Sequence, residues 1–334
     1  MSVIIVRTCA SYKEKQIGTP MPDADGKLLG QLLQNSGFDS REVIYATLFN
    51  KTQPDADFFC GKGTKVRPTG ADLTLPFIRG KYLKKEFSAE LQAAVKEILD
   101  EKPNLILTLG QVPLWAFTQE TNLKAFRGTV MAVGDQKLLP TYHPETIRKM
   151  YKFLPILCAD VAKASRESQS STFNYPERKI LIEPTLEEVL NWEKALENFA
   201  SILSLDIETA GDTITMVGFA HTIDRSIVIP FADKRKPGWS YWKTPNEEIS
   251  VWRAVKRVCA SQIPKVGQNL KYDIHWLWER AGVQIRNFQH DTMLMHHALQ
   301  PEMEKGLGFL GSLYTDSPAW KYLRTSKAVK ADDE

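Results

Sequence analysis

The chain lacks the marks of several protein classes. Its four cysteines are scattered along 334 residues without a CxxC pair, so we expect reduced core thiols, and neither a disulfide framework nor a zinc ribbon. No apolar run approaches the ~18 residues of a membrane span, and the amino end lacks the layout of a secretory signal. We therefore expect a cytoplasmic protein with no membrane contact.

Strong charge and compositional bias are also missing. A hydrophobic content of 43% and an aromatic content of 10% exclude disorder and fibrous structure, and the length favours two domains. The net charge is only +3. The first 170 residues carry 23 basic and 18 acidic side chains, and the remainder carries 20 and 22. The first half is thus compatible with a polyanionic partner, although its basic excess is modest.

A serine-rich stretch without apolar periodicity, residues 165–177, is the expected linker between a domain at 1–164 and one at 178–334. In the first domain, short buried strands alternate with helical patterns. This alternation predicts a parallel sheet covered by helices. The expected strands are 3–6, 43–49, 104–110 and 137–144, and the expected helices are 27–37 and 88–103.

The second domain has a different pattern, with four strands in quick succession that predict an antiparallel meander, followed by helices. The whole chain is therefore expected to be α/β with two domains. The expected strands are 178–183, 201–211, 213–221 and 226–231, and the expected helices are 246–261, 269–282 and 291–301.

Asp206 and Glu208 stand two residues apart in the apolar strand LSLDIETAG. Side chains at i and i+2 of a strand point to one face, so both carboxylates emerge together. Two clustered anions repel each other unless a cation intervenes, and hard oxygen ligands suit Mg²⁺ or Mn²⁺. The alternative is a surface strand that carries two acids with no function.

A second polar group lies in VGQNLKYDIHWL, residues 266–277. Asn269 and Asp273 are four apart, which places them on one face of a helix, with Tyr272 as a neighbour. Gly267 allows a close approach at the helix start. Burying such a polar stripe on an otherwise apolar helix is costly unless the side chains have a task.

Together, LSLDIETAG and GQNLKYDIHWL resemble the first two motifs of the 3′-5′ exonuclease domain of family A DNA polymerases, and HDTMLMHHALQPEMEKGLGFLGSLYTDSPAWK resembles bacteriophage members. The resemblance covers about residues 178–328 and implies a ribonuclease H-like fold. It also implies two-metal phosphodiester hydrolysis with Mg²⁺ or Mn²⁺ on DNA, at single strands or 3′ ends. Asp206, Glu208 and Asp273 would be the catalytic metal ligands. The residues that would contact substrate are Thr209, Gln268, Asn269 and Tyr272.

The family's third motif, Tyr-x-x-x-Asp, supplies a fourth carboxylate, and this sequence does not contain it. Tyr314 and Asp316 have the wrong spacing, and the acids at 332–334 read as a solvated tail. Asp291 is expected to cap a helix, and His296 with His297 to be packing or surface residues. The resemblance therefore leaves three readings: an amino-terminal piece of a longer polymerase, a site completed by another polypeptide, or weakened activity.

The first domain resembles uracil-DNA glycosylases of the iron-sulfur type, most clearly in LPTYHPETIRKMYKFLPILCADVAKA at 139–164. The position that reads uracil in the family falls on Leu48, Glu14 is the only acid in the first loop, and the cluster cysteines are missing. We therefore expect no iron-sulfur cluster and a DNA-binding unit without robust glycosylase chemistry. Its candidate DNA contacts are His143, Lys62, Lys65 and Arg67, and the alternative for the basic residues is a solvated surface without a partner.

The leading hypothesis is a DNA-processing protein of phage replication, in which a proofreading exonuclease is fused to a glycosylase-like DNA-binding domain, with a polymerase domain or subunit as partner. A non-catalytic DNA-binding or polymerase-accessory protein is the first alternative, and an active uracil-DNA glycosylase is the second. RNA trimming also stays open, because related exonuclease folds act on RNA.

Overall fold

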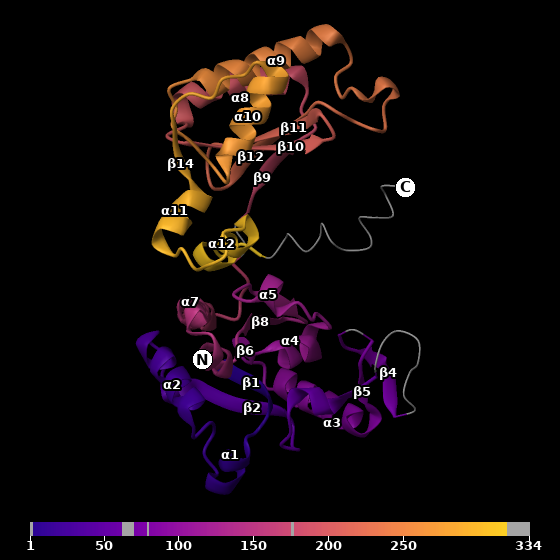
Figure 1. Cartoon of the computed structure of the whole chain (residues 1–334), viewed down its shortest axis with the longest axis vertical. Coiled ribbons are helices and arrows are strands. Elements are labelled where there is room, and N and C mark those ends of the chain that lie inside the picture. Colours follow the sequence, from indigo (N-terminus) through magenta and orange to yellow (C-terminus); the bar gives the residue numbers. More distant parts are fainter. Residues whose placement is uncertain (1–2, 62–69, 79, 175–176, 319–334) are drawn as a thin grey trace. The chain divides into compact units, whose positions relative to one another are not determined.

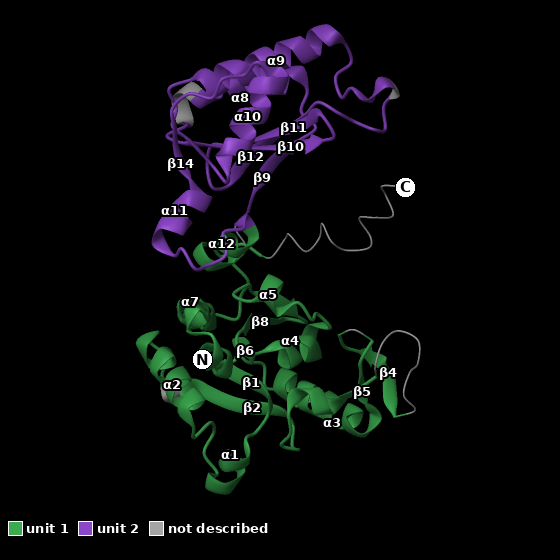
Figure 2. Ribbon diagram, in the orientation of Figure 1, with its two compact units in different colours: residues 1–175, 308–334 green, residues 176–307 purple. Residues whose placement is uncertain are grey.

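The computed structural model describes residues 3–61, 70–78, 80–174 and 177–318. The chain forms two compact units: unit 1 comprises residues 1–175 and 308–334, and unit 2 comprises residues 176–307 (Figure 2). Among the described residues, no helix has the length and apolar character that crossing a membrane requires.

Unit 1 is built on a five-stranded sheet in the order β2-β1-β6-β8-β7. The first four strands run parallel, and β7 joins the edge in the antiparallel direction. The four strands expected from the sequence are all present, which confirms the predicted parallel sheet. The strands are β1 (Val3–Cys9), β2 (Val43–Phe49), β6 (Leu105–Leu109), β7 (Met131–Val133) and β8 (Gln136–Thr141).

Helices cover both faces of this sheet (Figure 1). In β1, Val3 and Ile5 face a core shared with α2 (Ala24–Asn35) and α7 (Leu154–Ser168). Ile4 and Val6 face the opposite core, which α3 (Ser88–Asp100) and α4 (Gln111–Thr118) complete. Residues 3–6 of β1 are buried between these two cores, which explains why all four are aliphatic.

A small antiparallel sheet, in the order β3-β5-β4, was not expected from the sequence. Its strands are short and lack the alternation by which strands are recognised. Its strands and the remaining short elements of unit 1 are α1 (Tyr12–Ile17), η1 (Ser40–Glu42), η2 (Asp55–Phe58), β3 (Phe59–Cys60), β4 (Ala71–Pro76), β5 (Tyr82–Lys84), η3 (Lys85–Phe87), α5 (Leu123–Phe126), α6 (Pro144–Lys149) and η4 (Tyr151–Phe153).

The boundary region differs from the expected linker. Helix α7 continues to Ser168, so residues 165–168 are helical. Ser165 and Ser168 are buried, and the Ser168 hydroxyl donates to the Ser165 carbonyl at 2.7 Å. Asn104 Nδ2 also donates to the Ser168 carbonyl, at 2.8 Å. These tertiary contacts order serines that look like linker residues in the sequence.

The segment from Gly308 to the last described residues packs within unit 1, whereas the sequence placed it in the second domain. It begins in α12 (Leu307–Tyr314). The buried Lys163 ammonium donates to the carbonyls of Gly128 at 2.9 Å and Thr315 at 2.7 Å. A buried ammonium needs such acceptors, which gives this segment a polar anchor that no sequence pattern signals.

Unit 2 contains a mixed six-stranded sheet in the order β14-β13-β10-β11-β12-β9. Strands β10, β11 and β12 pair antiparallel, as the predicted meander requires. Strand β9 instead pairs parallel with β12, because the unexpected helix α8 separates it from β10 in the chain. The elements are β9 (Lys179–Ile182), α8 (Leu186–Phe199), β10 (Leu203–Ala210), β11 (Thr213–Ala220), β12 (Arg225–Pro230), β13 (Lys265–Gly267) and β14 (Phe288–Asp291).

Helices α8, α9 (Pro245–Ala260) and α10 (Leu270–Ala281) lie on one side of this sheet (Figure 1). They share a single apolar core with Leu205 and Ile207 of β10. The remaining elements are η5 (Pro237–Trp239) and α11 (Thr292–Leu299). Because alternate side chains of a strand point to opposite faces, this packing directs the neighbours of Leu205 and Ile207 away from the helices.

Candidate active site

Asp206 and Glu208 lie on the face of β10 opposite the core residues, as the spacing predicted. Asp206 is exposed and pairs across the sheet with Gly218, while Glu208 is half-buried and pairs with Met216. The ladder is irregular between Glu208 and Thr209, and the Glu208 carbonyl accepts the Thr215 hydroxyl at 3.0 Å. The strand therefore bends directly after the carboxylate pair.

Asp273 in the first turn of α10 reaches the same strand. Its Oδ1 accepts the Ile207 backbone N–H at 2.9 Å, although the two residues are 66 apart in the chain. The side chain is only 3% exposed. Burial, followed by the nearby negative charge of Asp206, raises the pKa of Asp273 to about 7. The structure thus brings Asp206 and Asp273 close enough to repel each other.

These carboxylates fit a divalent cation by donor chemistry. They offer hard oxygens, and a cation would relieve their repulsion. Among the described residues, no group of three or more His, Cys, Asp or Glu side chains is arranged to hold a metal ion. Mg²⁺ commonly binds through one or two protein carboxylates together with waters and substrate phosphates, so the pair Asp206 and Asp273 already offers the protein ligands that such a site needs.

The sequence predicted that Asn269 lies within the helix, but the structure places it before the first helical residue. It precedes α10 with φ 58° and ψ 43°, a left-handed conformation that asparagine tolerates better than most residues. Asp291 explains this conformation, since its carboxylate accepts the backbone N–H groups of Asn269 at 3.1 Å and Leu270 at 2.8 Å. The Asn269 side chain is exposed and makes no hydrogen bond to the described residues.

Asp291 also caps α11, as the sequence predicted. It accepts the N–H groups of Met293 at 2.9 Å and Leu294 at 3.3 Å. One carboxylate therefore starts two helices. His296 is buried and His297 is exposed, which confirms packing and surface positions for the two histidines.

Gly267 permits the close approach of α10 to β10, as predicted. A Cβ at this position would lie 2.6 Å from Leu270 Cδ1 and 3.2 Å from the Leu205 carbonyl oxygen. We expect Gly267→Ala to cost about 1–3 kcal/mol of stability and to weaken the bond between Ile207 and Asp273, because the helix must move away from the strand.

Hydrogen exchange of the Ile207 amide measures the second effect directly. The control is Gly30→Ala in α2, where an added Cβ meets nothing within 4 Å. Unchanged protection of the Ile207 amide in Gly267→Ala would contradict the close-approach role.

Thr209 and Tyr272, both predicted substrate contacts, touch each other. The Thr209 hydroxyl and the Tyr272 hydroxyl are 2.7 Å apart. Tyr272 is 43% exposed, and its ring lies 5.9 Å from the Trp276 ring. The pair therefore presents a partly open aromatic ring beside the bend of β10.

Gln268 is engaged at both ends of its amide. Its Nε2 donates to the Lys305 carbonyl at 2.7 Å, and its Oε1 accepts the Thr292 hydroxyl. The structure thus gives Gln268 a bracing role between β13 and the segment before α12. Contact with a nucleotide requires one of these bonds to open.

Asp316, whose spacing from Tyr314 does not fit the third motif, lies in unit 1. Its carboxylate is 3.5 Å from both Lys163 and Arg166 of α7. Asp332, Asp333 and Glu334 lie outside the described residues. The described part of unit 2 therefore gains no further metal ligand from these acids.

In unit 1, His143 lies after β8 and caps α6, where its Nδ1 accepts the Glu145 N–H at 3.2 Å. Burial lowers the pKa of His143, so a DNA contact at neutral pH would use the neutral imidazole. The other candidate DNA contacts, Lys62, Lys65 and Arg67, lie outside the described residues.

Glu14 and Leu48, the two positions compared with uracil-DNA glycosylases, lie after β1 and near the carboxyl end of β2, respectively. Glu14 forms an ion pair with Arg7, with nitrogen to oxygen distances of 2.7 and 2.9 Å, and completes a capping box on α1. Leu48 is buried in the core. Sequence reasoning missed Asp55, whose pKa burial raises and which interacts electrostatically with His143. Its position after β2, at the ligand-binding edge of a parallel sheet, was the available signal.

Comparison with known proteins adds one family match. Residues 182–330 match a family model described as 3′-5′ exonuclease. No curated protein matches the chain.

Several solved structures are similar to part of the chain. Trypanosoma brucei RNase D in complex with RNA U12 is 15% identical, over 45% of this chain and 51% of that one, with a TM-score of 0.36. The EXD2 exonuclease domain soaked in Mg and GMP is 18% identical over 44% and 74%, with a TM-score of 0.27. Brucella melitensis NrnC with bound Mg²⁺ is 15% identical over 42% and 62%, with a TM-score of 0.28. The chain covers 39% of the length of one Trypanosoma brucei RNase D structure and 51% of another, so it spans about half or less of these proteins.

The family match covers β10, with its two carboxylates, and α10, with the buried aspartate that contacts that strand. Residues 182–330 therefore carry a 3′-5′ exonuclease domain.

Proposed function

We propose that unit 2 is a divalent-metal-dependent 3′-5′ exonuclease that acts on single-stranded nucleic acid or on 3′ ends. The observation that carries the proposal is the proximity of Asp206 and Asp273 within the exonuclease match, expressed in the raised pKa of Asp273. The electrostatic repulsion between the carboxylates of Asp206 on β10 and Asp273 on α10 destabilises the folded chain, and a bound cation would offset it.

Each side chain has a proposed part in the reaction. Asp206, Glu208 and Asp273 would hold Mg²⁺ or Mn²⁺. When bound, the metal supplies activation of a water and stabilisation of the leaving 3′ oxygen. Tyr272, fixed by Thr209, would position the last nucleotide. Asn269, whose side chain has no hydrogen bond to the described residues, would contact that nucleotide.

The test uses 5′-labelled single-stranded DNA and RNA incubated with Mg²⁺, Mn²⁺ or EDTA. We expect a ladder that shortens from the 3′ end, loss of the ladder in EDTA, and a rate reduced on the order of 10³-fold by Asp206→Asn. Glu279→Gln, which neutralises an exposed acid on α10, is the matched control and keeps its rate. An unchanged cleavage rate in Asp206→Asn would contradict the catalytic role of Asp206.

One observation favours a second function for the same domain, namely nucleic-acid binding without hydrolysis. Among the described residues, no three potential ligands converge, and Asp316 pairs with lysine and arginine of unit 1. A binding protein of this kind shows salt-dependent DNA affinity with no ladder in either metal. A polymerase domain or subunit would then supply the chemistry.

For unit 1 we propose a glycosylase-like DNA-binding role in phage replication. The sequence resemblance and the parallel sheet covered by helices support the fold, and His143 at the carboxyl edge supports DNA contact. The ion pair that occupies Glu14 and the burial of Leu48 argue against uracil excision.

A further inference from the structure

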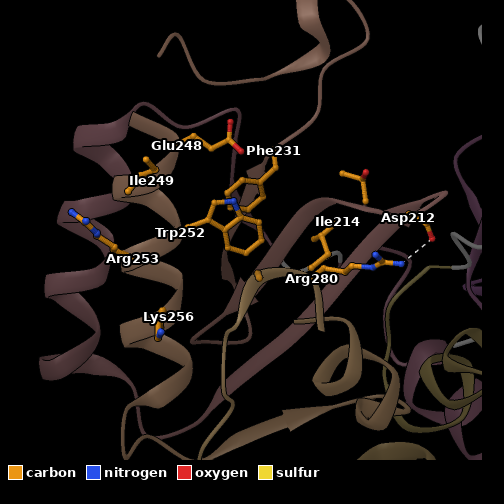
Figure 3. Close-up of a pocket in the computed structure, with 11 residues that line it drawn as sticks. Asp212, Ile214, Phe231, Glu248, Ile249, Trp252, Arg253, Lys256 and Arg280 are labelled. Carbon is orange, nitrogen blue, oxygen red and sulfur yellow. Dashed lines mark hydrogen bonds and ion pairs between the residues drawn. The ribbon is translucent and has the colours of Figure 1, made fainter. Parts of the chain in front are cut away.

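Unit 2 contains a cavity of about 560 Å³ that the proposed active site does not use. Its walls come from the turn between β10 and β11, the end of β12, α9 and the last turn of α10 (Figure 3). A volume of this size is typical of pockets that hold small organic ligands.

An aromatic pair forms one wall. Trp252 of α9 stacks on Phe231, with ring centroids 3.8 Å apart and an angle of 17° between the planes. Phe231 is 6% exposed, whereas Trp252 is half-buried and borders the cavity. The indole N–H of Trp252 makes no hydrogen bond to the described residues. The pair offers a supported aromatic surface with a donor at its edge, which suits a planar heterocycle.

The cavity is lined by three basic side chains, Arg253, Lys256 and Arg280, and by two acidic ones, Asp212 and Glu248. Arg253 and Lys256, one helical turn apart on α9, are exposed and form no ion pair with any described residue. Arg280 across the cavity is 3.0 Å from Asp212 (Figure 3). By contrast Arg257, the next residue on α9, is taken up by Glu193 at 2.6 and 2.7 Å. Arg253 and Lys256 thus have no ion-pair partner among the described residues, while Glu248 accepts the Ser240 hydroxyl at 3.0 Å.

We propose that this cavity binds a nucleotide, with its base at Trp252 and its phosphate at Lys256 and Arg253. Aromatic stacking beside basic side chains is the chemistry by which proteins hold single-stranded nucleic acid. The cavity lies at the other end of α10 from Asp273, since Arg280 follows Asp273 by seven residues, about 10 Å along the helix. The nucleotide is free in solution or is part of a strand, and both sources present the same base and phosphate.

The test measures binding in EDTA, on the full chain carrying Asp206→Asn, so it does not depend on hydrolysis. Fluorescence anisotropy of labelled (dT)10 and calorimetry with dTMP are the two arms. Arg253→Gln combined with Lys256→Gln is expected to weaken binding at least tenfold and to reduce the salt slope for (dT)10 by about 1.4. Lys179→Gln with Lys194→Gln removes the same charge from exposed positions of unit 2 that do not line the cavity, and is expected to change affinity less than twofold.

Trp252→Leu, checked for folding by its melting curve, is expected to weaken binding of the same ligand. If the cavity substitutions weaken the binding of dTMP, the cavity is a pocket for a free nucleotide. If they weaken the binding of (dT)10 alone, the cavity is a contact for a strand. Equal losses in the two charge variants, or no binding of either ligand, would overturn the proposal. A ladder in the nuclease assay without this binding leaves the exonuclease intact, which separates the two proposals.

Discussion

Without metal, the parent chain is expected to lose stability as the pH rises, and Asp273→Asn is expected to remove this pH dependence. The pKa of Asp273 is about 7 in the folded chain, against 3.8 as its ordinary value. Between these values the folded state keeps a proton that the unfolded state has lost, so stability falls as the pH rises from about 4 to 7. The full loss at pH 8 is about 2–4 kcal/mol, on the order of 10 °C in Tm.

Melting curves of both proteins in EDTA at pH 5 and pH 8 measure this effect. The amide introduced by Asp273→Asn keeps an oxygen for the Ile207 N–H, so the variant tests the charge and retains the hydrogen bond. Mg²⁺ or Mn²⁺ at pH 8 is expected to raise the Tm of the parent chain and to leave that of the variant nearly unchanged. If the Tm of the two proteins depends on pH in the same way, ionisation of Asp273 is not the cause of the loss of stability.

Asp160→Ala is expected to destabilise unit 1 by about 3–5 kcal/mol, because it leaves a buried guanidinium without its counter-ion. Asp160 and Arg127 are each 1% exposed. Asp160 accepts Arg127 Nε at 3.0 Å, Arg127 Nη2 at 2.5 Å and the Thr141 hydroxyl at 2.7 Å. The pair connects α7 to β8 and to the segment before β7.

Denaturant unfolding measures this loss, and Asp100→Ala is the control. Asp100 pairs with Lys96 on the exposed face of α3, where the removal of one charge costs less than about 1 kcal/mol. Arg127→Met combined with Asp160→Leu removes both charges and is expected to recover much of the stability. A loss in Asp160→Ala no larger than in the control would contradict the burial argument.

Local patterns were sufficient for the four parallel strands of the large sheet in unit 1 and for the helices α9, α10 and α11, because apolar runs and apolar periodicity report burial directly. They failed for α8, although Thr185 and Glu188 form a capping box at its start. Strand-like apolar segments flank this helix on both sides, and they favour a succession of strands over the helix that the capping box signals. Because α8 separates β9 from β10 in the chain, β9 pairs with β12 at the far edge of the sheet, which the predicted meander does not include.

The sequence by itself determined which side chains of unit 2 share a face. Asp206 and Glu208 are two apart on a strand, Asp273 is on a later amphipathic helix, and Gly267 allows that helix to approach the strand closely. Only the tertiary structure decided how these groups are used. The cap from Asp291 forces Asn269 out of the helix, and the acceptors of Lys163 hold the segment after Gly308 on unit 1. Such decisions depend on hydrogen-bond partners about 20 to 150 residues away, which the period of a local pattern does not encode.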